Sequence, residues 1–259
     1  MFTLLPLPAF DDNYIWVIHD GHHAIAVDPG DPAVLVAYLD AQRLSLTAVL
    51  ITHHHRDHTG GNIALAKQYG CPIYAPDNPR IPGNTHVLHD GDIVQFDAPE
   101  CCFEVLATPG HTLDHLSYVG HGLLFCGDTL FGCGCGKLFE GTPAIMAASL
   151  ERLLALPDAT RVCCAHEYTV NNIRFAKTLI GDNPALLERE RQDIASRAHH
   201  HPTLPSTLAL EKATNPFLQF HSLAMQQFAR HYLQTPCPGP GEIFGAIRAA
   251  KDSWDATQP

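Results

Sequence analysis

The chain of 259 residues has no long apolar run and few basic residues. No stretch approaches the roughly 18 apolar residues that a membrane-spanning helix needs, and the opening residues lack the basic, apolar and small-residue order of a signal peptide. With 16 Lys and Arg against 27 Asp and Glu, the formal net charge is -11, which disfavours non-specific binding to nucleic acid. We therefore expect a cytoplasmic protein that binds neither membranes nor nucleic acid.

The chain also lacks the cysteine pattern of a disulfide-stabilised protein. Its nine cysteines are odd in number and include the adjacent pairs Cys101-Cys102 and Cys163-Cys164, and neighbouring thiols rarely bridge. Cys133 and Cys135 lack the spacing and the second pair of a zinc knuckle, so packing or a loop is the favoured role. The pattern fits the reducing cytosol. No long apolar helix face lacks an expected partner, so we expect a monomer.

Strands and helices alternate in the first third of the chain, and a succession of strands follows. Hydrophobic patterns and turn residues predict strands at 14–18, 24–27, 48–51, 72–75, 86–88, 92–96, 102–107, 116–119, 123–126 and 161–165, and helices at 33–42, 62–69 and 144–156. Further helices are expected at 170–180, 184–198, 223–234 and 242–251, with a proline-containing connection over 199–217. We expect a mixed α/β domain over residues 1–169, followed by a smaller α-helical domain over 170–259.

The densest group of potential metal ligands is THHHRDHTGG at residues 52–61, directly after a predicted buried strand. His53, His55, Asp57 and His58 lie within six residues. Alternate residues of a strand share a face, so His53 and His55 are expected to point together, with Asp57 and His58 in the following turn. One metal cannot comfortably take all four, so the spacing predicts a binuclear centre. The alternative is a solvated or tag-like histidine run, but a tag would be terminal and would not contain Asp, Thr and Gly.

The pattern His53-x-His55-x-Asp57-His58 resembles the signature of the metallo-β-lactamase superfamily. The resemblance implies an αββα sandwich with metal ions at one edge. It leaves the substrate open, because the superfamily includes lactamases, nucleases, thioesterases and persulfide dioxygenases.

Three more potential ligands follow predicted strands. His111 comes after the strand at 102–107, Asp128 after 123–126 and His166 after 161–165. The superfamily resemblance assigns His53, His55 and His111 to one metal, Asp57, His58 and His166 to the other, and Asp128 to both. Imidazole and carboxylate suit Zn, Fe and Mn, and we expect two divalent ions, with zinc favoured over iron or manganese.

Other polar residues near these segments are not expected to bind metal. Asp28 ends a predicted strand and fits either an acceptor that orients a ligand imidazole or a turn residue. His54 and His115 are expected to be solvated or structural.

Longer motifs resemble one family in particular. Residues 127–142, GDTLFGCGCGKLFEGT, do not form a phosphate-binding loop, since Leu138 stands where Ser or Thr is required. They are similar to the GDTLF...GCGKxxEGT segment of the hydroxyacylglutathione hydrolases, or glyoxalase II. The similarity continues at AHEYT (165–169), TNPF (214–217) and IRAAKD (247–252). It therefore spans both expected domains.

This second resemblance implies a reaction and its residues. S-D-lactoylglutathione would be hydrolysed to glutathione and D-lactate, the second step of methylglyoxal detoxification, by a hydroxide that bridges the metals, with Asp57 and Asp128 as catalytic carboxylates. It implies that glutathione is contacted by Lys137, Tyr168, Arg248 and Lys251. Without the resemblance, Arg248 and Lys251 would be interpreted as a solvated pair on one helix face. Relatives often have Tyr where this chain has Phe139, so a hydroxyl contact is expected to be missing.

Three other functions are alternatives to this one. A persulfide dioxygenase would bind a single iron. A β-lactamase would be exported, and no signal peptide is recognised. A non-catalytic protein with a structural metal would use four ligands that close the coordination, usually rich in Cys. The His and Asp ligand set favours the hydrolase.

Overall fold

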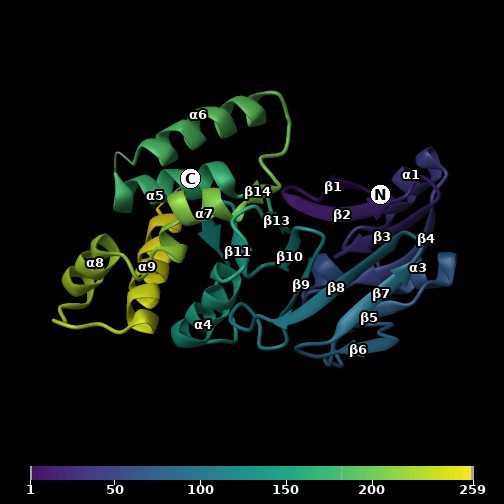
Figure 1. The fold of residues 1–259 in the computed structure, drawn as a ribbon, viewed down its shortest axis with the longest axis horizontal. Coiled ribbons are helices and arrows are strands. Elements are labelled where there is room, and N and C mark those ends of the chain that lie inside the picture. The colour runs from purple at the N-terminus through teal and green to yellow at the C-terminus, as the bar shows by residue number, and fades with distance from the viewer. Residues whose placement is uncertain (1, 182, 258–259) are drawn as a thin grey trace. The chain divides into compact units, whose positions relative to one another are not determined.

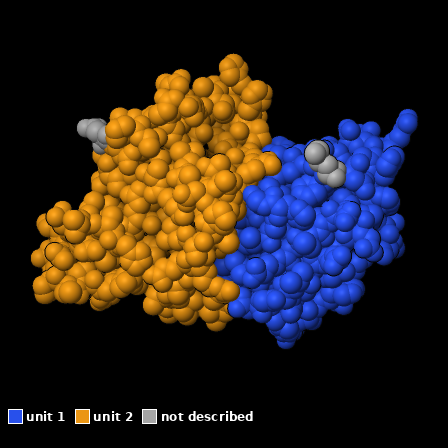
Figure 2. Space-filling view, in the orientation of Figure 1, with its two compact units in different colours: residues 1–108, 114–127, 162–166 blue, residues 109–113, 128–161, 167–259 orange. Residues whose placement is uncertain are grey.

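The chain folds into two compact units, shown as a ribbon in Figure 1 and by colour in Figure 2. The computed structural model describes residues 2–181 and 183–257. Unit 1 comprises Met1–Thr108, Asp114–Gly127 and Val162–His166, and unit 2 comprises Pro109–Leu113, Asp128–Arg161 and Glu167–Pro259. Both units therefore combine segments that are distant in sequence, and the expected domain boundary near residue 170 stays a prediction.

Unit 1 is built around two sheets. The first has the order β1 (Thr3–Ala9), β2 (Asn13–His19), β3 (His23–Val27), β4 (Ser45–Leu50), β5 (Ile73–Pro76) and β6 (His86–Leu88). The second, within this unit, has the order β13 (Arg161–Cys164), β10 (Leu123–Gly127), β9 (Leu116–Gly120), β8 (Glu100–Ala107) and β7 (Ile93–Asp97). The helices of this unit are α1 (Pro32–Gln42), α2 (Arg56–Thr59) and α3 (Asn62–Tyr69).

Both faces of the first sheet are buried at β2. On one face Trp16 of β2 packs against Phe125 of β10, with ring centroids 6.2 Å apart, and its Nε1 donates to the Cys164 carbonyl at 2.9 Å. On the other face Val17 packs in one apolar cluster with Leu35 of α1 and Leu65 of α3. Because neighbouring strand residues point to opposite faces, β2 joins a helical layer to the second sheet. This double burial explains its continuous apolar run.

Local signals position the helices of unit 1. The Asp31 side chain accepts from the Ala33 backbone N–H at 2.9 Å and so caps α1, whose first residue is a proline. Gly70 ends α3 in a left-handed conformation with φ 65°. The strands and helices predicted between residues 14 and 180 are confirmed to within three residues.

The strand β1 was not predicted, because it contains Pro6 and Pro8. Proline removes a backbone donor and is normally confined to sheet edges. β1 is an edge strand, since it pairs only with β2 in the sheet order.

Unit 2 is mainly helical. It contains β11 (Leu130–Phe131), β12 (Gly134–Cys135), α4 (Pro143–Leu154), α5 (Thr169–Ile180), α6 (Pro184–Ala198), β14 (Ser206–Thr207), α7 (Leu208–Thr214), the 3-10 helix η1 (Pro216–Leu218), α8 (Leu223–Leu233) and α9 (Pro240–Asp255). None of the helices in the described part of the chain is long and apolar enough to cross a membrane.

The prediction of a connection over residues 199–217 was wrong for its second half, which contains β14, α7 and the start of η1. Thr207 caps α7 by accepting from the Leu210 N–H at 3.2 Å. Pro205 precedes β14, and Pro216 is the first residue of η1. The prolines therefore mark the borders of these elements and do not interrupt them.

Candidate active site

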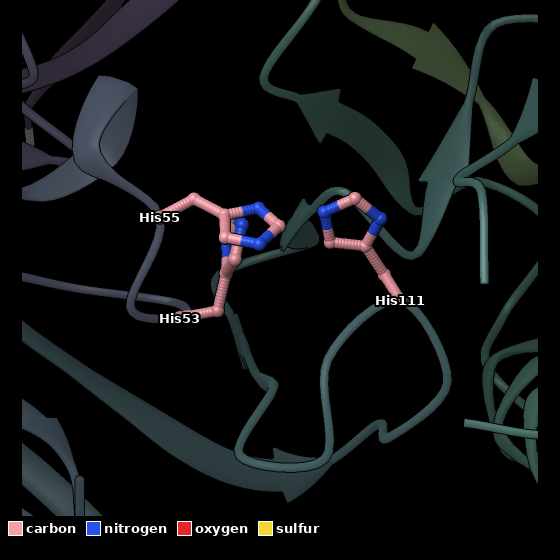
Figure 3. Close-up of side chains that lie close together, drawn as sticks. All are labelled: His53, His55 and His111. Carbon is pink, nitrogen blue, oxygen red and sulfur yellow. The ribbon is translucent and has the colours of Figure 1, made fainter. Parts of the chain in front are cut away.

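The histidine-rich motif begins where β4 ends. β4 ends at Leu50. Two residues later, the Thr52 backbone N–H donates to the Asp28 side chain at 2.8 Å. His53 and His54 lie in a bend, His55 directly precedes α2, and Asp57 with His58 lie on α2. The prediction that His53 and His55 point together because they alternate along a strand gave the wrong reason, since neither residue lies in β4. Their rings nevertheless lie together, with centroids 4.6 Å apart (Figure 3).

Besides the pair His53 and His55, unit 1 contains a second group of potential ligands. It combines the carboxylate of Asp57 with the imidazoles of His58 and His166. Asp57 Oδ2 lies 3.2 Å from His58 Nε2 and 3.4 Å from His166 Nε2. One ligand atom from each of these residues lies within 4.8 Å of the other two. His166 follows β13, so the backbone brings the end of a strand of the second sheet to the motif after β4. Two nitrogen donors and one oxygen donor fit a divalent ion such as zinc, iron or manganese.

Asp57 is held in its ionised form. Burial by itself would raise the pKa of Asp57, but hydrogen bonds from His166 and His58 outweigh burial and hold that pKa well below its usual range. A carboxylate must be deprotonated to bind a cation. The surroundings of Asp57 therefore favour the state that a metal ligand requires.

Two residues that the sequence did not indicate contact this group. Asp12 Oδ1 lies 2.7 Å from His166 Nδ1, and Asn13 Nδ2 donates to Asp57 Oδ2 at 3.0 Å. Asp12 lies in the turn between β1 and β2, and Asn13 is the first residue of β2. In the sequence, a polar Asp-Asp-Asn run between apolar segments indicates a turn, and no local signal connects it with residue 166. A carboxylate on the far imidazole nitrogen fixes the orientation of the ring.

Asp28 orients part of the motif, which was one of the two interpretations left open. It accepts from the Thr52 N–H and from Thr52 Oγ1 at 2.8 and 2.7 Å, and its Oδ2 lies 3.0 Å from His58 Nδ1. Its φ of 52° is in the left-handed region, which Asp tolerates better than most residues. Asp28 thus links the end of β3 to the loop after β4.

His54 and His115, which are not proposed ligands, contact neighbouring side chains. His54 Nδ1 lies 2.9 Å from Asp114 Oδ1. His115 is buried, with Nδ1 3.0 Å from Thr108 Oγ1, and its ring stacks on that of His53. The solvated or structural role expected for both residues stays a prediction.

Unit 2 contains the other two predicted ligands. His111 Nε2 lies 3.3 Å from Asp128 Oδ2, and His111 Nδ1 lies 2.8 Å from the Lys137 carbonyl oxygen. Figure 3 also draws the His111 ring. A Cβ at Gly136 would lie 1.9 Å from the Asp128 carbonyl oxygen, so this backbone packing requires a glycine. Gly136 thus allows the backbone to pack closely beside Asp128 and His111.

The predicted glutathione contacts also belong to unit 2. Arg248 and Lys251 are buried, so their interpretation as a solvated pair is wrong. Arg248 Nη1 donates to the Cys135 carbonyl at 3.0 Å, and Lys251 pairs with Asp255. Burial lowers the pKa of Lys251, against the opposing effect of Asp255.

Two aromatic residues complete this group. Tyr168 is partly exposed and meets the Phe131 ring edge-on, with centroids 5.3 Å apart. Phe139 is 66% exposed, and its ring centroid lies 5.2 Å from that of His111. The residue that lacks the expected hydroxyl therefore borders a predicted metal ligand. Lys137 is exposed.

Comparison with known proteins is consistent along the whole chain. Residues 9–166 match the metallo-beta-lactamase superfamily, and residues 167–254 match the hydroxyacylglutathione hydrolase C-terminus. The hydroxyacylglutathione hydrolase of Thiobacillus denitrificans is 68% identical over 255 residues, which cover 98% of this chain and 100% of that protein. That of Nitrosomonas eutropha is 46% identical over 254 residues, or 98% and 100%. The chain belongs to the hydroxyacylglutathione hydrolase family.

Solved structures share the metallo-beta-lactamase fold of this chain. ETHE1 from Myxococcus xanthus is 25% identical, with a TM-score of 0.65 over 98% of this chain and 99% of that one. The BLEG-1 B3 metallo-beta-lactamase is also 25% identical, with a TM-score of 0.62 over 84% and 99%. The expected fold class, a metallo-β-lactamase domain followed by a helical domain, is confirmed. The His and Asp groups of this hydrolase family member fit divalent metal ions.

Proposed function

We propose that the chain hydrolyses S-(2-hydroxyacyl)glutathione thioesters and converts S-D-lactoylglutathione to glutathione and D-lactate. The observation that carries the proposal is the group formed by Asp57, His58 and His166, in which the carboxylate is kept ionised. This group lies in a chain that aligns with hydroxyacylglutathione hydrolases over their full length.

The proposal includes two divalent metal ions. We assign them to the two ligand groups of unit 1 and the His111–Asp128 pair of unit 2, that is, to His53, His55, Asp57, His58, His111, Asp128 and His166. Zinc is the first candidate, with iron or manganese as alternatives. A similar protein, TTHA1623, has been solved in a di-iron-bound form and is 26% identical, with a TM-score of 0.60 over 82% of this chain and 99% of that one. Two such ions would acidify water and polarise a thioester carbonyl.

The protein's own residues prepare this centre. The hydrogen bonds to Asp57 keep its carboxylate deprotonated, and Asp12 and Asp28 hold the imidazoles of His166 and His58. Ligands that are already oriented and deprotonated need no rearrangement when an ion binds. The leaving group is a thiolate, which departs without a dedicated general acid.

We assign the tripeptide part of the substrate to unit 2. Glutathione carries two carboxylates, and a chain of net charge -11 needs local cations to hold either of them. The proposed contacts are Lys137, Tyr168, Arg248 and Lys251. Two of these cations are buried, and a buried cation attracts a carboxylate more strongly than an exposed one.

The test is hydrolysis of S-D-lactoylglutathione by the purified protein, followed as loss of thioester absorbance, with metal content measured on the same sample. We expect rapid hydrolysis and close to two metals per chain. The Asp128→Ala variant should lose both activity and metal. If that variant keeps two metals and full activity, the proposed centre is wrong.

The same experiment separates other functions. If two metals are bound but the thioester is not hydrolysed, the protein would still be a binuclear hydrolase, but its substrate would be a different one. One iron per chain, oxygen consumption and no hydrolysis would indicate a persulfide dioxygenase.

A further inference from the structure

A pocket of about 670 Å³ opens beside Asp57 in unit 1. It is lined by Phe10, Asn13, Gly30, Pro32, Arg56, Asp57 and Gly60. Asp57 is the one residue of this lining to which the proposed function gives a direct role. The volume is in the range of pockets that bind small molecules.

Phe10 is placed at this pocket by an unusual backbone conformation. It lies between β1 and β2 with φ 51°, in the left-handed region, which is rare for a bulky residue. Its side chain is 57% exposed. Residues held in sparsely populated conformations cluster at ligand sites.

Gly30 brings the Phe10 ring close to the Asp57 backbone. A Cβ at Gly30 would lie 3.0 Å from Phe10 Cε2 and 1.7 Å from the Asp57 carbonyl oxygen. Any larger residue at position 30 would displace the Asp57 backbone. The absence of a side chain therefore keeps an exposed aromatic ring next to the loop that carries a proposed metal ligand.

The chemistry of the lining suits an apolar group. Phe10 and Pro32 provide apolar surface, and the Asn13 amide already donates to Asp57. Arg56 is the one cation of the lining, and it is exposed. Glutathione carries two carboxylates and an ammonium group, and its proposed contacts all belong to unit 2. The part of the thioester that remains for unit 1 is the acyl group.

We propose that this pocket receives the acyl group of the thioester and that Phe10 is a specificity-determining residue that favours aromatic over small acyl groups. The assignment rests on the proposed function. A lactoyl group has three carbons and would fill little of the volume, whereas a phenyl ring would pack against that of Phe10. Such ring pairs add affinity beyond the apolar area that they bury.

The test compares S-D-mandeloylglutathione with S-D-lactoylglutathione, two 2-hydroxyacyl thioesters that differ by phenyl against methyl. The readout is the ratio of their kcat/KM values. In Phe10→Ala we expect this ratio to fall about threefold to tenfold, because kcat/KM falls more for the mandeloyl ester than for the lactoyl ester. Phe10→Tyr keeps the ring and should retain the ratio. Phe10→Asn removes the ring and tolerates the left-handed backbone, so it serves if the alanine variant folds poorly.

Ile93→Ala is the matched control, because Ile93 is an exposed apolar residue of unit 1 outside the pocket. It should leave the ratio unchanged. If Phe10→Ala and Phe10→Asn both keep the wild-type ratio, or lose both activities in parallel, the assignment of this pocket to the acyl group is wrong. The proposed hydrolase function would still stand. If the wild type hydrolyses neither ester, the proposed function itself fails, and the acyl assignment fails with it.

Discussion

Asp28 supports the candidate active site without being a proposed ligand. It accepts two hydrogen bonds from Thr52 and lies 3.0 Å from His58 Nδ1. In Asp28→Asn we expect metal affinity to fall by about 10- to 100-fold, because the neutral amide polarises the imidazole less. Asparagine also tolerates the left-handed backbone at this position, so the fold should be retained. Competition with a coloured chelator measures the affinity.

The control for Asp28 is Asp97→Asn, which neutralises an exposed carboxylate at the end of β7 in the same unit. It should leave metal affinity unchanged. Equal affinities in the wild type and both variants would show that Asp28 does not support the metal ligands.

Phe139 offers a second prediction at a single position. The Phe139→Tyr variant restores the hydroxyl expected from the family pattern and should lower KM for S-D-lactoylglutathione by about two- to tenfold, the effect of one hydrogen bond. We expect kcat to stay constant, since a contact made equally in ground and transition states changes only binding. Steady-state kinetics measure both constants. Phe139→Leu adds no hydroxyl and should not lower KM, and a change in kcat alone would contradict the prediction.

At the level of elements, two of the arginines of α6 lie in opposite environments. Arg189 is 2% exposed and donates to Glu211 Oε1 and Thr214 Oγ1, each at 2.7 Å, which ties α6 to α7. Burial by itself would lower the pKa of Arg189, but Glu211 outweighs burial and raises it, so the guanidinium stays charged. Arg191, two residues later, forms an exposed pair with Glu188.

These two pairs form a matched experiment. Arg189→Met leaves the buried Glu211 carboxylate without its cation and should reduce the free energy of unfolding by about 3–5 kcal/mol. Arg191→Met should cause no measurable change, because both partners of that pair are solvated. Urea unfolding measures the two variants under the same conditions. Similar losses in both would mean that burial does not decide the contribution of these pairs.

Helices and strands were predicted correctly where the residues that define them are neighbours in the sequence. The helices α1 and α3 were predicted from a cap, a first-turn proline or a terminal glycine, and the structure confirms them. β1 was missed because its prolines are acceptable only at a sheet edge, and edge position is decided by strand order. α7 was missed because the prolines on either side of it outweighed its own cap at Thr207.

For the whole molecule, metal binding should contribute to stability. An ion that binds only the folded chain stabilises it by about 2.7 kcal/mol at a concentration 100 times its Kd. We therefore expect a strong chelator to abolish hydrolysis and lower Tm, and added zinc to restore both. Calorimetry and the thioester assay measure the two effects on one sample.

A His53→Ala variant provides the control for metal removal. It lacks one proposed ligand, so zinc should restore its Tm and activity less completely than those of the wild type. An unchanged Tm after proven removal of the metals would contradict a stabilising role for the centre.

The sequence by itself determined the family, most of the secondary structure and the identity of the candidate ligands. These properties depend on patterns within short stretches of the sequence, such as the spacing of His53, His55, Asp57 and His58. The glycine-rich segment at 127–142 and the C-terminal motif at 247–252 added the family resemblance, which the comparisons confirmed.

Only the tertiary structure decided how these ligands are supported. Asp12 reaches His166 across 154 positions of the chain, Asp28 reaches His58, and Phe10 borders the pocket beside Asp57. Such contacts arise when strands from distant segments pack side by side, and no local periodicity records which segments will meet. The burial of Arg248 and Lys251 has the same origin, because the sequence places them on one helix face and tertiary packing decides what covers it.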